Sequence, residues 1–186
     1  MKTKKMLCIA LCGVMPIMVM GCEIEDPKTT TTPVKNKQKH GKKHKKTVAA
    51  KTGDSIDLQA QSGVLRVRAI KITRLTSPRN SYETAPDGME YVGVGMSIRN
   101  DGDKTYTDAV SNGAQLILAD GSAGETAIVS DMGCDDAGFG SDLVLPAGAE
   151  RKGCLAFTVP KGAGVKQLIF RPDSGYSDSI GVWDLR

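Results

Sequence analysis

Apolar and polar positions alternate along much of the chain after residue 52, with the period of two that is typical of β-strands. In residues 64–72 the apolar positions alternate with basic ones, so the basic side chains are expected to face solvent. These side chains are Arg66, Arg68 and Lys71, and a change of register is expected near Ala69. The pattern predicts a long strand with one buried face.

A second long strand is predicted over residues 91–99. Its larger apolar residues, at positions 92, 94, 96 and 98, face one way, and small residues face the other way. Further strands are predicted at residues 114–118, 126–129, 143–145, 154–159, 166–170 and 180–185. No stretch shows a convincing 3.6-residue apolar period of any length. About eight short strands separated by turns predict an all-β fold, an antiparallel two-sheet β-sandwich over residues 52–186.

Turn residues separate the predicted strands. Asn-Asp-Gly-Asp at 100–103 and Ala-Asp-Gly-Ser at 119–122 provide turn chemistry, because Gly, Asn and Asp tolerate conformations that other residues avoid. The strand that ends in Asn100-Asp101-Gly102 is expected to need residues that accept a positive φ there.

The first part of the chain follows a different pattern. Three lysines in the first five residues precede an apolar run over residues 6–20, which is shorter than the roughly 20 apolar residues of a transmembrane helix. The four residues that end this segment, Val19-Met20-Gly21-Cys22, resemble the lipobox of bacterial lipoproteins. The resemblance implies a signal peptide over residues 1–21, lipidation of Cys22, and a membrane anchor on the extracytoplasmic face of the cell membrane. An ordinary secretory signal and an uncleaved anchor are the alternatives.

Residues 22–51 read as a disordered basic tether. After a run of four threonines, residues 35–51 contain eight Lys and two His, and apolar residues are almost absent before Val48. Such a segment lifts a domain off the membrane, and its charge would attract anionic lipids or anionic cell-wall polymers. A merely soluble spacer is the alternative. His40 and His44 are poor metal ligands here, because the surrounding ammonium groups repel a cation.

The charge of the chain is divided between its segments. The whole chain carries +4, but residues 23–51 carry nine Lys against three acidic residues, and residues 52–186 carry thirteen basic against eighteen acidic residues. The part that folds is therefore mildly acidic, and its composition gives no reason to expect a nucleic-acid partner.

The five cysteines also indicate export. Cys8 and Cys12 lie in the predicted signal peptide and Cys22 would carry lipid, so that Cys134 and Cys154 remain as a pair. In a chain bound for an oxidising compartment, a disulfide between them is the simplest interpretation. A metal-binding pair or a catalytic thiol is the alternative.

Candidate catalytic groups are few in the predicted domain. Residues 52–186 contain no histidine, which removes Ser-His-Asp and Cys-His machinery and the common zinc hydrolases. Paired carboxylates at 135–136, or at 101 and 103, are more typical of solvated turns than of acid–base catalysis. Calcium is the better alternative, with oxygen ligands from Asp101, Asp103 and Asp108 or from the aspartates at 131, 135 and 136, although neither set follows the EF-hand spacing. We expect no enzyme activity, no cofactor and no metal.

The loop over residues 131–141 is the predicted contact surface, because loops on a rigid scaffold often carry function. Asp131, Asp135, Asp136 and Phe139 are its candidate ligand-contact residues. The loop is small and acidic, which is unlike a deep apolar pocket, so a surface protein, a peptide or a wall polymer is the expected partner. The chain is interpreted as a non-catalytic binding module. A wall-embedded spacer bound through its tether, a calcium-binding surface domain and an accessory domain of a membrane complex are the alternatives.

Several short motifs, in a fixed order, carry a resemblance to a known family. They are Gly-Val-Leu-Arg-Val at 63–67, Glu-Tyr-Val at 90–92, Ile-Arg-Asn-Asp-Gly at 98–102, Leu-Ala-Asp-Gly at 118–121, Leu-Pro-Ala-Gly at 145–148, Gly-Cys-Leu-Ala-Phe-Thr-Val-Pro at 153–160 and Leu-Ile-Phe-Arg-Pro at 168–172. Together they resemble immunoglobulin-like domains of unknown function that are widespread in Gram-positive lipoproteins and secreted proteins. That family is similar in fold to mycobacterial secreted immunoprotective antigens. The resemblance implies a β-sandwich and an extracellular setting, and it implies no catalytic residues.

Overall fold

The computed structural model describes residues 46–75, 83–129, 134 and 137–186. Its strands are β1 (Lys46–Lys51), β2 (Ser55–Ala60), β3 (Gly63–Leu75), β4 (Met89–Asn100), β5 (Tyr106–Asp108), β6 (Ala114–Leu118), β7 (Ala123–Ala127), β8 (Leu143–Leu145), β9 (Glu150–Pro160), β10 (Val165–Phe170) and β11 (Ser179–Asp184). Two 3-10 helices, η1 (Val110–Gly113) and η2 (Asp173–Gly175), complete the described elements.

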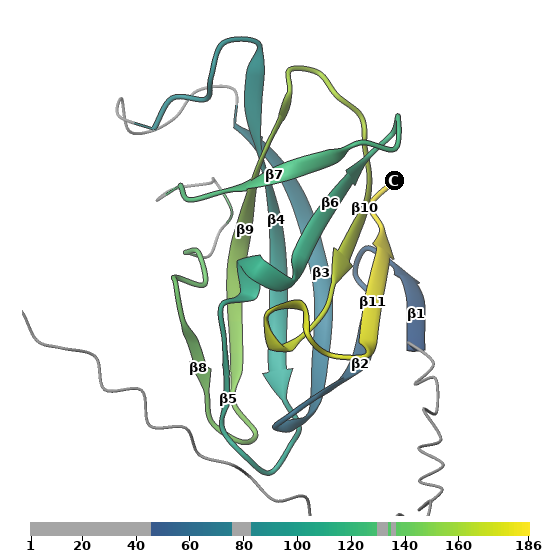
Figure 1. Cartoon of the computed structure of the whole chain (residues 1–186), viewed down its shortest axis with the longest axis vertical. Coiled ribbons are helices and arrows are strands. Elements are labelled where there is room, and N and C mark those ends of the chain that lie inside the picture. The colour runs from purple at the N-terminus through teal and green to yellow at the C-terminus, as the bar shows by residue number, and fades with distance from the viewer. Residues whose placement is uncertain (1–45, 76–82, 130–133, 135–136) are drawn as a thin grey trace, which may run out of the picture. The chain divides into compact units, whose positions relative to one another are not determined.

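The strands form an immunoglobulin-like β-sandwich, which confirms the predicted fold class. Nine strands follow one hydrogen-bonded order, β1-β11-β10-β6-β7-β9-β4-β3-β2, and β5 pairs with β8 in a separate two-stranded sheet. Figure 1 shows β6, β10 and β11 in front of β3, β4 and β9, with β7 running across them. Because β7 pairs with β6 on one side and with β9 on the other, it joins the two layers.

The core lies between the two layers. Alternate positions of the long strands are fully buried, as a period of two requires. The largest side chains without exposed surface are Trp183, Tyr106, Phe157, Phe170, Leu58, Leu65, Met96, Ile98, Leu116, Leu118, Leu168 and Val67. One contiguous apolar cluster therefore holds both sheets together.

The predicted irregularity in β3 is confirmed. The ladder between β3 and β4 shifts register between Ala69 and Lys71. Arg66 is exposed, whereas Arg68 and Lys71 are half-buried. An extra residue in one strand changes which face the following side chains occupy, and this explains why the alternation of residues 64–72 breaks at that point.

The boundary of the predicted tether is wrong at its C-terminal end. Residues 46–51 form β1, which pairs in parallel with β11, and the half-buried side chains of Val48 and Ala50 pack against the core. The turn after β1 then passes to β2 in the other layer, and the indole Nε1 of Trp183 donates to the Asp54 carbonyl at 3.0 Å. Backbone hydrogen bonds to β11 stabilise this strand independently of its side chains. The lysine content of the segment, on which the tether prediction rested, therefore did not reveal the strand.

Two other strands were missed and one was misplaced. The sequence patterns gave no prediction for β2 or for the three-residue β5. The strand expected at residues 126–129 is β7, at Ala123–Ala127. The sequence of β5, Tyr-Thr-Asp, lacks the apolar residues that marked the equally short β8, Leu-Val-Leu.

The Asn-Asp-Gly turn after β4 is built differently from the expectation. Asn100, Asp101 and Gly102 all lack a positive φ. Glycine is required at 102 for space, since a Cβ there would lie 2.4 Å from the carbonyl oxygen of Ser62. The strand end thus packs directly against the β2–β3 turn.

Asn100 is the polar centre of this turn and has no exposed surface. Its Nδ2 donates to the carbonyl oxygens of Lys104 at 2.7 Å and Leu145 at 2.9 Å. Its Oδ1 accepts from the backbone N–H of Gly102 at 3.0 Å. One side chain therefore ties the end of β4 to the segment that leads into β5 and to β8.

We predict that Asn100→Leu lowers the free energy of unfolding by about 3 kcal/mol. The carbonyl of Leu145 loses its partner in a buried hydrogen bond, and the carbonyl of Lys104 and the N–H of Gly102 lose theirs in partly buried ones. Urea unfolding of the variant and of the parent chain measures the loss. Asn112→Ala, at an exposed position of η1, is the matched control and should change stability by less than about 0.5 kcal/mol. Equal, small losses in both variants would contradict the role given to Asn100.

Candidate functional site

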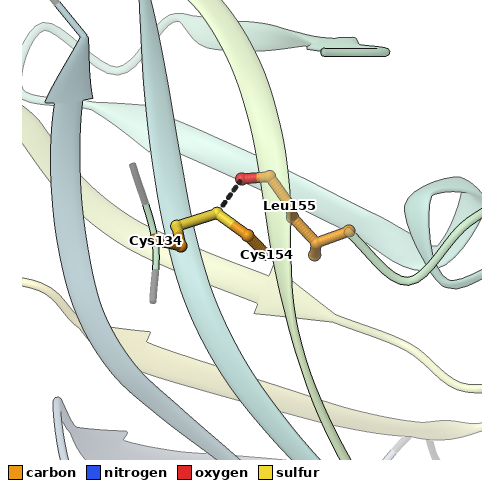
Figure 2. The surroundings of a disulfide bond; sticks show 3 residues. All are labelled: Cys134, Cys154 and Leu155. Carbon is orange, nitrogen blue, oxygen red and sulfur yellow. Dashed lines mark hydrogen bonds between the residues drawn. A yellow bond between two sulfur atoms is a disulfide. The ribbon is translucent and has the colours of Figure 1, made fainter. Parts of the chain in front are cut away.

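The structure joins Cys134 and Cys154 in a disulfide, with their Cα atoms 6.0 Å apart and a sequence separation of 20 (Figure 2). Cys154 Sγ lies 3.9 Å from the carbonyl oxygen of Leu155, and this is a contact only, since a disulfide sulfur carries no proton. Cys154 and Ala156 form a small apolar cluster with Tyr91, Ala127, Val129 and Cys134. Closing a loop of this length stabilises the fold by about 3 kcal/mol in the chain-entropy model.

The predicted contact loop is described only in part. Asp131, Asp135 and Asp136 lie outside the described residues. Phe139 is only 6% exposed, and its ring occupies the space beside Gly153, where a Cβ would lie 2.9 Å from the ring carbons. Phe139 is therefore mainly a core residue, whose ring fills the space left by the absence of a side chain at Gly153. Only a small part of Phe139 borders the surface.

An apolar hollow of about 400 Å³ lies beside the disulfide. Its walls include Ile128 and Val129 after β7, Leu155 and Ala156 of β9, and Phe139. Ile128 is fully exposed at 102%. The apolar lining of this hollow comes from β9, from the residues that follow β7 and from Phe139 of the predicted contact loop.

The first aspartate set proposed for calcium does not form a site. Asp101 pairs instead with Arg99 Nε at 2.7 Å and Arg66 at 3.3 Å, and Asp108 is buried. Among the described residues, no three His, Cys, Asp or Glu side chains come close enough to hold a metal ion. The aspartates at 131, 135 and 136 lie outside that part of the chain.

A second hollow, the polar pocket, lies where the loop between β10 and β11 meets β5 and the β2–β3 turn. Its volume is about 470 Å³. The loop is drawn in yellow in Figure 1. The residues that line the pocket are Gln61, Ser62, Lys104, Thr105, Tyr106, Thr107, Asp108, Asp173, Ser174 and Tyr176. Three segments far apart in the sequence thus meet around one polar cavity.

The buried side chain of Asp108 forms the base of the polar pocket and links β5 to the β10–β11 loop. Its side chain is buried, with 4% exposed, and its Oδ1 accepts from the Ser174 N–H at 2.7 Å and from the Ser174 hydroxyl at 2.6 Å. Its Oδ2 accepts from the hydroxyl of Tyr106. Burial, followed by the neighbouring Asp108, raises the pKa of Tyr106 far above its ordinary value. The phenol consequently stays protonated and keeps donating to the carboxylate.

The loop above this base of the pocket has an unusual backbone. Asp173 and Ser174 have positive φ values of 56° and 52°, and Gly175 follows at 88°. Non-glycine residues in this region cost about 1–3 kcal/mol each and persist only where the surroundings hold them. Contacts on both residues hold them here. Ser174 is bound to Asp108, the Asp173 N–H donates to the Tyr106 hydroxyl at 3.4 Å, and Asp173 Oδ2 accepts from the Gln61 N–H at 3.0 Å. The loop is therefore fixed to both β5 and the β2–β3 turn.

Ser62 provides a polar group without a partner. Its side chain is 8% exposed, it lines the polar pocket, and its Oγ has no hydrogen-bond partner among the described residues. Leaving a buried hydroxyl unpaired costs about 1–3 kcal/mol. The Oγ atom has almost no solvent-accessible surface of its own, so it is buried and is not presented to the cavity.

Tyr176 stands at the rim of the polar pocket with 86% of its surface exposed. An aromatic ring presented to solvent beside polar groups is a common feature of binding surfaces. Sequence analysis identified neither Tyr176 nor Ser62, Tyr106, Asp173 and Ser174 as site residues. The Asp-Ser-Gly run after Pro172 is the one local signal of a special turn in this region.

Comparisons with known proteins agree with this architecture. Residues 50–180 match the model of a domain of unknown function, DUF4352. The chain belongs to this family. No curated protein is similar enough in sequence to this chain to count as a relative.

Solved structures of low sequence identity share the DUF4352 fold seen here. The secreted protein MPT63 from Mycobacterium tuberculosis has a TM-score of 0.56 at 18% identity, over 74% of this chain and 97% of that one. The yjhA protein from Bacillus subtilis has a TM-score of 0.52 at 13% identity, over 74% and 99%. The Bacillus subtilis protein ycdA, named as a candidate lipoprotein, has a TM-score of 0.50 at 19% identity, over 73% of this chain and only 39% of its own.

The described part of this DUF4352 protein contains no helix with the length and hydrophobicity that a membrane crossing requires.

Asp173 makes the stability of the domain depend on pH. Burial, and after it the charge of Asp108, raises the pKa of this carboxyl, although the hydrogen bond from Gln61 opposes the shift. When the pKa of a carboxyl is higher in the folded than in the unfolded state, protonation of that carboxyl favours folding. The stability that Asp173 gains in this way is complete below the unfolded pKa of about 4 and is lost as pH rises through the folded pKa.

We predict that Asp173→Asn raises the melting temperature relative to the parent at neutral pH. This gain should disappear toward about pH 3, where the carboxyl of Asp173 is protonated in both the folded and the unfolded chain. Asparagine also accepts a positive φ and can still accept from Gln61. Thermal unfolding across a pH series measures the difference. A gain that grows toward acidic pH would contradict the assignment.

Proposed function

We propose that this DUF4352 protein is an extracytoplasmic lipoprotein, anchored through Cys22, whose β-sandwich is a non-catalytic binding module. The observation that carries the binding role is the polar pocket, which three sequence-distant segments enclose and which the exposed side chain of Tyr176 borders. The lipobox, the disulfide and the fold shared with a secreted protein support the extracytoplasmic setting.

The chemistry of the polar pocket favours binding over catalysis. Both oxygens of Asp108 are already occupied, by Ser174 and Tyr106, so this carboxylate is not available as a base or nucleophile. Glycoside cleavage needs two working carboxyl groups that flank the bond, and only Asp173 is left for such a role. The pocket is therefore suited to hold a ligand rather than to cleave it.

The lysine-rich tether provides a second, purely electrostatic means of binding to the cell envelope. Its lysines would attract anionic lipids or anionic wall polymers by charge alone, and this attraction weakens as salt screens it. Because β1 begins at Lys46, the proposed tether between the lipid and the domain shortens to residues 22–45.

We predict that Cys22→Ala abolishes lipid attachment while the domain still folds. Metabolic labelling with a clickable fatty acid, followed by detergent phase partition of the full-length protein, measures attachment. The parent protein should carry the label and enter the detergent phase, and the variant should do neither. A labelled Cys22→Ala protein would exclude this cysteine as the anchor.

We further predict that envelope binding has a part that depends on the polar pocket and resists salt. Co-sedimentation of residues 23–186 with purified cell envelopes across a salt series measures it. Tyr176→Ala should weaken the salt-resistant part about tenfold, as removal of an aromatic anchor does. Ile128→Ala, an equally exposed apolar position at the other hollow, is the matched control and should bind as the parent does.

A third variant, in which the lysines of residues 35–45 are replaced by glutamine, separates the tether from the domain. The binding-module proposal expects it to lose only the salt-sensitive part of envelope binding. Loss of all binding in this variant, with none in Tyr176→Ala, would identify the protein as a spacer held through its tether.

A further inference from the structure

We infer that the outer face of the layer formed by β2, β3, β4 and β9 binds a phosphate group between Arg68 and Lys152. The inference goes beyond the proposed function, because this face shares no lining residue with the polar pocket. It begins from the charged side chains that cross these four strands, which are neighbours in the sheet (Figure 1).

Two adjacent rows of side chains cross this face, because directly opposed residues of neighbouring strands lie on the same side of a sheet. The residues between the two rows on β2, β3 and β4 are Ile56, Val67 and Ile98, which are buried in the core, so both rows point away from it. From β2 to β9, the first row consists of Asp57, Arg66, Arg99 and Glu150. The second row consists of Ser55, Arg68, Ser97 and Lys152.

The arginines of the first row are compensated within the protein. Arg66 Nε donates to Asp57 at 3.0 Å, and its Nη2 lies 3.3 Å from Asp101. Arg99 Nε donates to the other oxygen of Asp101 at 2.7 Å. Like charges directly opposite each other, as at Arg66 and Arg99, destabilise a ladder, and the carboxylate of Asp101 offsets their repulsion. This row therefore needs no anion from outside.

The second row contains two cations and no carboxylate. Arg68 is half-buried and Lys152 is exposed, and within the described part of the chain neither side chain has a hydrogen bond or an ion pair. Both lie directly opposite Ser97, so their Cα atoms are about 10 Å apart and their long side chains can reach one ligand between them. Acidic residues outnumber basic ones over residues 52–186, so the absence of a carboxylate here does not come from a shortage of acids.

A small hollow of about 190 Å³ lies over the second row. The buried Ser97 forms part of its wall, and the hydroxyl of Ser97 donates to Glu150. Three guanidinium groups and one carboxylate line the hollow, which gives the lining a formal charge of +2. Its volume is below the roughly 300–1,000 Å³ of pockets for drug-sized ligands and suits a single oxyanion group. The lining residues are Ser55, Arg66, Arg68, Ser97, Arg99 and Glu150.

The donors around the hollow match the oxygens of a phosphate. The planar fork of Arg68 can donate two parallel hydrogen bonds to two phosphate oxygens. The ammonium group of Lys152 can pair with a third oxygen from the other side, and the hydroxyl of Ser55 offers a further donor at the strand edge. A carboxylate has only two oxygens and would leave Lys152 without a partner. A phosphate ester is therefore the ligand class that uses both cations.

The first experiment titrates ¹⁵N-labelled residues 23–186, with the lysines of residues 35–45 replaced by glutamine so that the tether does not compete for anions. Glycerol 3-phosphate is the probe, with glycerol and acetate as comparisons. The phosphate should shift the amide signals of Arg68, Ser97 and Lys152 at low ionic strength with a dissociation constant of about 1 mM. Glycerol should cause no shifts, and acetate should bind more weakly. Absence of shifts with the phosphate, or equal affinity for acetate, would overturn the inference.

Three variants of the same protein test the named residues. Arg68→Gln should weaken glycerol 3-phosphate binding at least about fivefold, because it removes the bidentate donor, and Lys152→Gln about threefold. Arg151→Gln is the matched control, since it removes one positive charge from the neighbouring position of β9, whose side chain points to the other side of the strand. It should bind as the parent does. Equal weakening in all three variants would reveal a general effect of charge and overturn the site.

Two further probes separate the sources of the phosphate group. One is a soluble poly(glycerol phosphate) chain, and the other is vesicles of phosphatidylglycerol and phosphatidylcholine in equal amounts. Binding that Arg68→Gln weakens identifies the source: a wall-type polymer, a lipid headgroup, or both. Binding to both probes that is indifferent to Arg68 would contradict the inference. Tyr176→Ala should leave phosphate binding unchanged, so the polar pocket and this site can fail separately.

Discussion

The buried carboxylate of Asp108 is the interaction on which the candidate site depends. Removing a carboxylate from water is costly unless several donors replace the lost hydration. Here three donors do so: the hydroxyl of Tyr106, and the N–H and hydroxyl of Ser174. Since Tyr106 belongs to β5 and Ser174 to the β10–β11 loop, satisfying this one charge requires the two segments to lie together.

A chain of polar contacts leads from the core strands to this carboxylate. Asn100 fixes the end of β4 and the segment that leads into β5, which positions Asp108. Asp108 then holds Ser174 in a left-handed conformation, and Gln61 holds Asp173 beside it. The contacts of Asn100 and Asp108 satisfy side chains that are buried, whereas the contact between Gln61 and Asp173 lies at the exposed surface. Ser62 differs from these residues, because its buried Oγ has no hydrogen-bond partner among the described residues.

The fold was predictable from sequence where its causes are local. Alternation with a period of two identified β3, β4, β6, β8, β9, β10 and β11, and the break near Ala69 appeared as a bulge. The pairing of Cys134 with Cys154 followed from parity. In contrast, β1 was missed because parallel pairing to β11 depends on the backbone and on a distant strand, while its lysines match a solvated tether.

The candidate site was not predictable for a related reason. Its residues come from positions 61–62, 104–108 and 173–176, and none of these segments has a motif that carries chemistry by itself. Aspartate, serine and tyrosine at turns are common, so their importance becomes visible only when the topology brings them around one cavity. The loop that the sequence did favour contributes a core side chain, Phe139, and borders an apolar hollow instead.

Amide hydrogen exchange at Ser174 tests the central claim most directly, because this N–H is bound to a buried carboxylate in a loop that would otherwise open to solvent. The account predicts slow exchange, comparable to that of strand amides such as Leu168 and linked to unfolding of the whole domain. Exchange as fast as in exposed turns would contradict it. The β10–β11 loop would then not be fixed by Asp108, and the polar pocket would not be a preformed site.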